Sequence, residues 1–285
     1  MSIARPQDDQ PATEWESPFT LEAARIEAFE REGFAKLKGV FSADSLGVLR
    51  REVMKTVQRD GSSVAEQNED EAYPSEDMDL YRKAFTQVYN LWSQSELIRS
   101  FVSGRLAQIA AGLLGVSGVR IYHDQALIKE PGGSATPWHM DHYYWPLATA
   151  KVLTAWIPLV EVSAAMGPLD FAAGSHRLDY GRDFELVQQE ELITEARLSE
   201  AGCAVAKSGY QPGEVSFHDG WCFHRAGANQ TDQRREVLTV IYMDQEMTLQ
   251  HPANSNQEYD REKWCPGVAV GEVVSSEINP IVFTR

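Results

Sequence analysis

Cysteine is scarce in this chain of 285 residues, which contains only three. Cys203, Cys222 and Cys265 are odd in number and widely spaced, so they predict neither a disulfide framework nor a CxxC metal site. Reduced thiols are the simplest account of this pattern, and they are typical of a cytoplasmic protein.

Long apolar runs are also missing. The sequence shows no stretch close to the roughly 20 apolar residues that a membrane helix requires. Residues 1–16 are polar, contain proline and lack the apolar core of a signal peptide. We therefore expect a soluble, cytoplasmic protein in which residues 1–16 are flexible.

Basic residues are few relative to acidic ones. The chain has 26 Lys and Arg against 42 Asp and Glu, a formal net charge of −16. Such a field repels phosphate backbones and anionic lipid, which argues against nucleic acid and membranes as partners. Hydrophobic residues make up 43% of the chain, enough to offset the entropy of ordering a folded core.

Two kinds of periodicity divide the rest of the chain. From residue 17 to about 115 the apolar spacing is helical, as in Leu46, Leu49, Val53 and Val57 after a capping Ser42. From about 118 to 245, short runs rich in Val, Ile, Tyr and Trp are bounded by Gly, Pro or Asn, which indicates strands.

We predict a single domain, 17–285, of the α+β class with a mainly β core: a helical flank followed by a sandwich or jelly roll. An acidic, helical insertion is expected at about 179–208, where a solvent-facing covering helix is the simpler interpretation. A carboxy-terminal extension follows at 246–285. The acidic segment 62–79 lacks periodicity and is expected to be a long loop, either a lid or disordered.

The residues that carry chemistry lie in two segments. In TPWHMDHYYWP, His139 and Asp141 are two apart, so on a strand their side chains share one face while Met140 points away. His224, in SFHDGWCFHRAGAN, supplies a second imidazole from a distant strand. Two histidines and one carboxylate on one face of an ion are typical of non-haem Fe(II) oxygenases. His142 is a competing candidate that we expect to line the entrance.

Arg235 lies eleven residues after His224. Residues 216–224 and 235–243 both have strand character, so we predict a hairpin that places Arg235 on the strand beside His224. A guanidinium forms two parallel hydrogen bonds with a carboxylate. The implied ligand is a dicarboxylate, with one end on the metal and the other on Arg235. The alternative is an ordinary surface arginine, as we expect for Arg234.

Three stretches together resemble the phytanoyl-CoA dioxygenase family. They are LIKEPGGSATPWHMDHYYWP, LTAWIPLVEVSAAMGPLDFAAGSHR and PGEVSFHDGWCFHRAGANQTDQRR. The similarity covers roughly residues 20–245, and the combination of motifs in this order is far more specific than any one of them. The family consists of Fe(II)- and 2-oxoglutarate-dependent oxygenases built on a double-stranded β-helix.

The resemblance implies a role for particular residues. His139, Asp141 and His224 would be the iron ligands and Arg235 would bind the distal carboxylate of 2-oxoglutarate. Further residues that it places at the cosubstrate are Trp156, which also fits core packing, and, less specifically, Gln125 and Lys129. The chain departs from the family at Ala226, where a serine that contacts the cosubstrate is common; Thr239 or a water is a possible replacement.

The implied reaction consumes O2 and 2-oxoglutarate, releases succinate and CO2, and oxidises a C–H bond of a substrate. Halogenating relatives replace the carboxylate ligand with a small residue, so Asp141 favours hydroxylation or a related oxidation. Acidity argues mildly against acyl-CoA, and we expect a small hydrophobic or natural-product-like substrate. Aromatic residues that could line its pocket, or equally the core, are Tyr81, Phe85, Trp92, Tyr143, Tyr144 and Trp145.

Two alternatives remain open from the sequence. One is an iron oxidase of the same fold that does not use 2-oxoglutarate, against which Arg235 argues. The other is a non-catalytic jelly-roll protein that binds a small molecule, which would require a broken set of metal ligands. The prime substrate and the oligomeric state are open as well.

Overall fold

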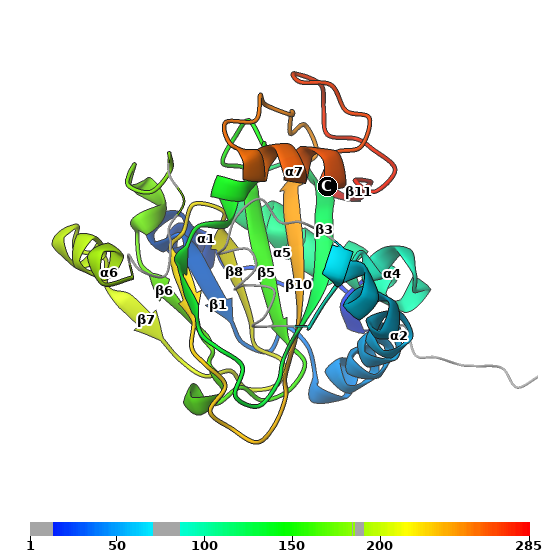
Figure 1. The fold of residues 1–285 in the computed structure, drawn as a ribbon. Helices are drawn as coiled ribbons and strands as arrows, with labels where there is room; N and C mark the ends of the chain where they lie inside the picture. The colour runs from blue at the N-terminus through cyan, green and yellow to red at the C-terminus, as the bar shows by residue number, and fades with distance from the viewer. Residues whose placement is uncertain (1–13, 71–85, 184, 186–190) are drawn as a thin grey trace, which may run out of the picture.

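The strands of the β-rich part form two antiparallel sheets (Figure 1). The computed structural model describes residues 14–70, 86–183, 185 and 191–285. The major sheet has the order β1-β8-β5-β10-β3-β11, and β2 also pairs with β3. Its strands are β1 Phe34–Leu37, β2 Thr86–Tyr89, β3 Gly118–Lys129, β5 Val152–Pro158, β8 Val215–Asp219, β10 Arg235–Asp244 and β11 Ile281–Thr284.

The minor sheet has the order β4-β9-β6-β7. Apolar side chains from both sheets meet between them: Leu127, Trp156 and Val237 from the major sheet pack with Leu169 and Phe171 from the minor one. The two sheets therefore form the jelly roll that the sequence predicts. The minor-sheet strands are β4 Thr136–His139, β6 Leu169–Ala172, β7 Val205–Lys207 and β9 His224–Ala226.

Successive side chains of β10 point alternately to the two faces of the major sheet, and both faces are covered by apolar clusters. Leu238, Val240 and Tyr242 pack against the helical layer. Val237 and Ile241 face the other way, into the apolar clusters between and at the end of the sheets. A strand that is buried on both faces has a nearly continuous apolar sequence, as VLTVIYM does at residues 237–243 of β10.

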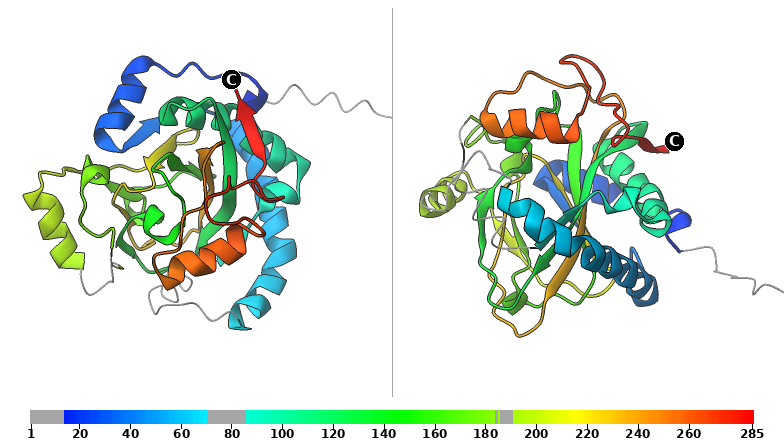
Figure 2. Two further views of the ribbon diagram at one scale, coloured as in Figure 1. Left: turned by 90° about the horizontal axis from the view of Figure 1, so that it is seen from above. Right: turned by 45° about the vertical axis from the view of Figure 1, so that its right-hand side comes forward.

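Helices from the amino-terminal part cover the outer face of the major sheet (Figures 1 and 2). The helix expected after Ser42 is confirmed, since α2 begins at Ala43 and the Ser42 hydroxyl accepts the Ser45 N–H at 3.2 Å. Two further helices lie elsewhere: α6 packs on the minor sheet and α7 crosses one end of the sheets. The helices are α1 Ala23–Glu32, α2 Ala43–Asp70, α4 Glu96–Ser103, α5 Arg105–Leu114, α6 Glu191–Glu200 and α7 Ser255–Trp264.

The helices α4 and α5 are together apolar enough to resemble a membrane-spanning helix. Taken together, Glu96–Leu114 has the length and hydropathy of a membrane span, contrary to the expectation that no such stretch is present. The helical conformation is interrupted at Gly104, between α4 and α5. A Cβ atom at this position would clash with the carbonyl oxygen of Trp15. Most of the apolar side chains of both helices are buried in the core beside the major sheet. Both helices belong to the core beside the major sheet.

Several boundaries differ from the sequence-based expectation. Residues 14–16 form a 3-10 turn whose Trp15 is buried, so the expected flexible segment does not extend over them. The loop predicted for 62–79 is wrong over 62–70, which belong to α2. The remainder of that loop, together with Tyr81 and Phe85, lies outside the described residues.

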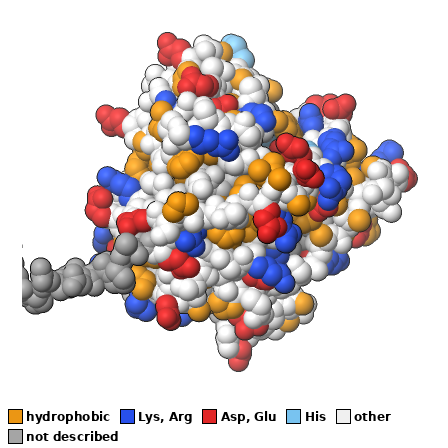
Figure 3. All heavy atoms as spheres, turned by 180° about the vertical axis from the view of Figure 1, so that it is seen from behind, with side chains coloured by type: hydrophobic (Ala, Val, Ile, Leu, Met, Phe, Trp, Pro, Cys, Tyr) orange, Lys and Arg blue, Asp and Glu red, His pale blue; other side chains and the backbone are white. Residues whose placement is uncertain are grey.

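The surface and the cysteines follow the composition. On the face in Figure 3, acidic and basic side chains are interspersed with apolar ones. Cys203, Cys222 and Cys265 are buried free thiols, as expected.

Candidate metal centre

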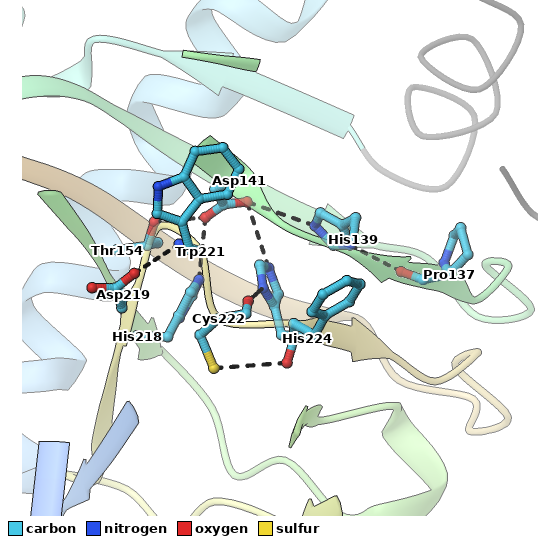
Figure 4. A network of polar contacts seen from close by, with 10 residues as sticks. Pro137, His139, Asp141, Thr154, His218, Asp219, Trp221, Cys222 and His224 are labelled. Carbon is cyan, nitrogen blue, oxygen red and sulfur yellow. Dashed lines mark hydrogen bonds and ion pairs between the residues drawn. The ribbon is translucent and has the colours of Figure 1, made fainter. Parts of the chain in front are cut away.

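The two histidines of the predicted triad lie side by side on neighbouring strands. His139 on β4 is paired with His224 on β9, and their rings are 4.1 Å apart between centroids. The Asp141 Oδ1 atom is 3.6 Å from His139 Nε2 and 3.5 Å from His224 Nε2 (Figure 4). One ligand atom from each residue therefore lies within 4.8 Å of the other two, close enough to hold one ion.

Local backbone geometry places Asp141 on the same side as His139. β4 ends at His139, Met140 is still extended with φ −128° and ψ 126°, and Asp141 begins a 3-10 turn. Met140 is buried with Trp138 in the cluster outside the minor sheet. The alternation predicted from the HxD spacing is thus realised at the end of the strand.

Hydrogen bonds fix the histidine tautomers. The Nδ1 of His139 donates to the carbonyl oxygen of Pro137 at 2.9 Å, and the Nδ1 of His224 donates to that of Cys222 at 3.0 Å. This leaves the Nε2 lone pair of each ring for a metal. Burial, followed by the charge of a neighbouring histidine, lowers the pKa of both His139 and His224 to about 4. Both rings are neutral at pH 7, which is the ligand form.

The other oxygen of Asp141 is held from the major sheet. Oδ2 accepts the hydroxyl of Thr154 on β5 at 2.7 Å and the Nε2–H of His218 on β8 at 3.2 Å. Burial alone would raise the pKa of Asp141, but the electrostatic interaction with the His224 ring and the hydrogen bond from His218 outweigh it and hold the pKa below its usual range. The carboxylate is ionised, with Oδ1 directed at the histidines.

Thr154 and His218 were not among the residues predicted from the sequence. A signal for both was present in the alternation of the strands. Thr154 is two residues before Trp156, and His218 is two residues after Ser216, so each shares the inward face of its strand. Identifying them required the register between β5 and β8, which pairs Thr154 with His218.

A cavity opens from the triad toward Arg235, which is 1% exposed. The Arg235 guanidinium lies 5.7 Å from the ring centroid of Trp156 and donates to the carbonyl oxygen of Gly167. Gly167 has φ +74°, and a Cβ there would clash with the backbone of Gly227. The cavity is lined by Gln125, Leu127, Thr136, His139, Asp141, Thr154, Trp156, Leu169, His218, His224, Ala226, Arg235 and Thr239.

The predicted hairpin between 216–224 and 235–243 is wrong. β8 and β10 lie on opposite sides of β5 in the major sheet, and His224 belongs to β9 in the minor sheet. Arg235 nevertheless reaches the same cavity as His224, because the two sheets face each other across it. The expected proximity arises from sheet packing.

Of the weaker cosubstrate predictions, Gln125 lines the cavity, as do Ala226 and Thr239. The Thr239 hydroxyl donates to the Gln125 carbonyl oxygen at 3.4 Å. Lys129 is fully buried and is paired with Arg235 in the β3–β10 register. Burial, and then the charge of Arg235, lower the pKa of Lys129 to about 6. An anion bound at Arg235 would relieve this concentration of positive charge.

The aromatic residues near the motif have mainly packing roles. Trp145 is buried in a cluster under α7, and Trp92 is buried on the helical side of the major sheet. Tyr143 is 8% exposed. The expectation that His142 lines the entrance is wrong, because its ring is 2% exposed and stacks on Trp221 at 4.5 Å. The stacked Trp221 ring and a hydrogen bond to the carbonyl oxygen of Leu147 hold the His142 ring in the interior.

The donor set fits iron. Two neutral imidazole nitrogens and one carboxylate oxygen can occupy one face of an octahedral ion and leave the opposite face for other ligands, as in non-haem Fe(II) oxygenases. A buried arginine across the cavity suits a dicarboxylate that also reaches the metal. The fold and the site together define a jelly-roll Fe(II)- and 2-oxoglutarate-dependent oxygenase.

Comparisons with known proteins agree with this class. The family model of phytanoyl-CoA dioxygenase matches residues 29–237, and the chain belongs to this family. The ectoine dioxygenase of Bordetella parapertussis is 28% identical over 251 residues, which cover 81% of this chain and 78% of that protein. The ectoine dioxygenase of Sphingopyxis alaskensis is 25% identical over 268 residues, 84% of this chain and 81% of that protein.

Solved structures share the fold. The carbocyclase SnoK of nogalamycin biosynthesis superposes with a TM-score of 0.72 at 23% identity, covering 94% of this chain and all of SnoK. EctD from S. alaskensis, solved with 2-oxoglutarate and 5-hydroxyectoine, superposes with a TM-score of 0.67 at 21% identity, covering 93% of this chain and 90% of EctD.

The family, its relatives and the metal centre establish the class of reaction. The protein is an iron- and 2-oxoglutarate-dependent dioxygenase, as the sequence predicts. The predicted fold, a mainly β jelly roll with flanking helices, and the predicted cofactors are confirmed.

Proposed function

We propose that this protein hydroxylates a C–H bond of a small organic substrate, using His139, Asp141 and His224 to bind the iron. Arg235 binds the distal carboxylate of 2-oxoglutarate, with Trp156 and Gln125 along its length. The observation that carries this proposal is the single cavity that the triad and the buried Arg235 share. The buried thiols fit a cytoplasmic location.

Iron and 2-oxoglutarate, when bound, would activate O2, so that one oxygen atom converts 2-oxoglutarate to succinate and CO2 and the other oxidises the substrate C–H bond. The chain's own residues prepare for this in the absence of substrate. Thr154 and His218 hold Asp141 so that one oxygen faces the metal position. The hydrogen bond from the Nδ1 atom of each ligand histidine, His139 and His224, to a backbone carbonyl oxygen restricts rotation of the ring. This preorganisation lowers the cost of assembling the site.

Positioning of 2-oxoglutarate falls to the far end of the cavity. Arg235 is fixed by its bond to Gly167 and by the Trp156 ring beside it, so the guanidinium is oriented before the ligand arrives. Lys129 pairs with Arg235 in the β3–β10 register, and a dicarboxylate bound at Arg235 would favour the protonated form of Lys129, which burial and the Arg235 charge otherwise disfavour. Ala226 removes one hydroxyl that many family members have, and Thr239 on the facing strand lines the same cavity.

The type of outcome follows from Asp141. With a carboxylate in the third ligand position, that position is closed to a halide, which favours oxygen insertion or a related C–H oxidation. Curated relatives named ectoine dioxygenases support a small organic substrate, and ectoine is the first compound to test.

Anaerobic addition of Fe(II) and 2-oxoglutarate should give the weak visible charge-transfer band of the chelate. Absence of this band with protein in excess would refute the cosubstrate assignment. Asp141→Ala should abolish succinate production, whereas the matched control Asp232→Ala, on an exposed turn, should leave it unchanged. Undiminished succinate formation by the Asp141 variant would show that the metal ligands are misassigned.

The substrate can then be identified by measuring which compounds increase the release of succinate. A panel that contains ectoine and small hydrophobic acids, each tested with Fe(II), 2-oxoglutarate and O2, should include compounds that raise turnover above the uncoupled rate. Mass spectrometry of the product distinguishes a gain of one oxygen from a loss of two hydrogens.

A further inference from the structure

Glu191, the first residue of α6, connects that helix to both histidine-bearing strands. Its Oε2 accepts the backbone N–H of Trp138 at 2.8 Å, and its Oε1 accepts Nη1 of Arg225 at 2.8 Å. Trp138 immediately precedes His139, and Arg225 immediately follows His224. One carboxylate therefore joins the residues next to two of the three proposed iron ligands.

The contact lies at an irregular point in the minor sheet. β4 and β9 pair at Thr136 with Ala226 and at His139 with His224, and the register shifts between these pairs. Trp138 lies within that shift, and its N–H is directed to Glu191. A charged acceptor forms a stronger hydrogen bond than a neutral carbonyl does. Glu191 thus stabilises β4 where the ladder is irregular, one residue from His139.

Arg225 adds a second connection across the same surface. Its guanidinium lies 4.6 Å from the ring centroid of Trp138, and its Nε donates to Asp170 on β6 at 3.2 Å. The side chains of Arg225 and Glu191 are 19% and 27% exposed, so solvent screens their attraction only partly. The two ligand strands and β6 are linked behind the metal centre.

Apolar packing holds α6 against this network. Leu198, two turns along α6 from Glu191, is 1% exposed and packs in one cluster with Trp138 and Met140. Met140 is the residue between His139 and Asp141. α6 therefore contacts the back of the HxD segment through its first residue and through its buried face.

We propose that Glu191 is a positioning residue, which couples the docking of α6 on the minor sheet to the geometry of the iron ligands. This inference rests on the proposed roles of His139 and His224. When α6 is docked, Glu191 fixes the separation of β4 and β9, and metal binding in turn stabilises docked α6. The coupling is reciprocal, as thermodynamic linkage requires.

The test uses the full chain with Co(II) as an oxygen-stable probe of the iron site. Glu191→Ala removes both contacts, and Glu191→Gln keeps an acceptor for Trp138 but removes the charge. Glu195→Ala is the matched control, because Glu195 is on the same helix and lies 3.7 Å from Arg225. Co(II) affinity is measured by competition with a chelator, and amide hydrogen exchange is followed over Glu191–Glu200 with and without Co(II) and 2-oxoglutarate.

Glu191→Ala should weaken Co(II) binding about tenfold, at the lower end of the range for residues that orient metal ligands. Glu191→Gln should show a smaller loss, and Glu195→Ala should bind like the wild type. Metal with 2-oxoglutarate should slow exchange in α6 of the wild type and of Glu195→Ala, but not of Glu191→Ala.

Equal Co(II) affinity and equal protection of α6 in the wild type and Glu191→Ala would overturn the coupling. If Glu191→Ala fails to fold, the same comparison with Glu191→Gln decides. Failure of the proposed function has a different signature: the wild type itself would bind no Co(II) at the triad.

Discussion

The hydroxyl of Thr154 offers the sharpest test of how this centre is built. It donates to Asp141 Oδ2 at 2.7 Å, while the more distant His218 Nε2 donates to the same oxygen at 3.2 Å. Thr154→Val keeps the shape of a side chain that is 4% exposed and replaces the hydroxyl with a methyl group. The carboxylate then loses its shorter bond and gains freedom to rotate Oδ1 away from the metal position.

The magnitude follows from the charge on the acceptor. A hydrogen bond to a charged group contributes roughly 1.5–3 kcal/mol. The His218 bond remains in the variant, so we expect a loss at the lower end, about 1.5 kcal/mol, which is slightly more than tenfold in affinity. This agrees with the 10–100-fold effect typical of residues that orient metal ligands.

The assay is competitive titration of Co(II) against a fluorescent chelator, without 2-oxoglutarate. Thr239→Val is the matched control: Thr239 lines the same cavity and is 2% exposed, but its hydroxyl donates to a backbone carbonyl of β3. The control should bind Co(II) like the wild type. A folded Thr154→Val protein with unchanged Co(II) affinity would refute the reasoning, because Asp141 would then be held without the hydroxyl.

Three further predictions concern the cosubstrate, pH and backbone. Arg235→Met should raise the KM for 2-oxoglutarate at least tenfold with Co(II) affinity unchanged, and the exposed neighbour Arg234→Met should change neither. The pKa of His139 and of His224 is about 4 in the folded protein and 6.5 in an unperturbed histidine. As the pH falls, these histidines therefore bind protons in the unfolded chain before they do so in the folded protein. Stability of the metal-free protein should therefore fall as pH drops from about 6.5 to 4, measured by thermal melts; a flat profile would contradict this. Gly167→Ala, at φ +74° and against Gly227, should lower the melting temperature and raise the 2-oxoglutarate KM, since the Gly167 carbonyl holds Arg235.

The sequence predicts most of the metal centre because its information is local. His139 and Asp141 are two residues apart, and the face they share follows from strand alternation alone. Arg235 was placed near His224 by an incorrect hairpin. The eight residues between β9 and β10 carry the chain from the minor sheet to the major sheet, and nothing local distinguishes such a crossing from a turn.

The elements that the sequence did not predict depend on distant partners. β1 is four residues long and pairs with β8, with partners 178 to 184 residues apart in the sequence, so its short pattern gives little signal. The acidic end of α2 is the exception: it carries no apolar stripe, but its Ala, Glu and Gln residues favour a helix by local propensity alone. Thr154 and His218 became recognisable only once the strand register brought them to one carboxylate.

The metal centre draws its parts from both layers of the jelly roll. The histidines belong to the minor sheet, whereas the side chains that aim Asp141 belong to the major sheet. The spacing of the layers, about 10 Å in such folds, therefore sets the angle at which the carboxylate approaches the ion. Apolar residues that fill the interior between the layers, such as Trp156 and Phe171, act as spacers. Changes in their size would tune the metal's coordination, and through it its redox potential, from a distance; a directed-evolution experiment on this scaffold should find such positions.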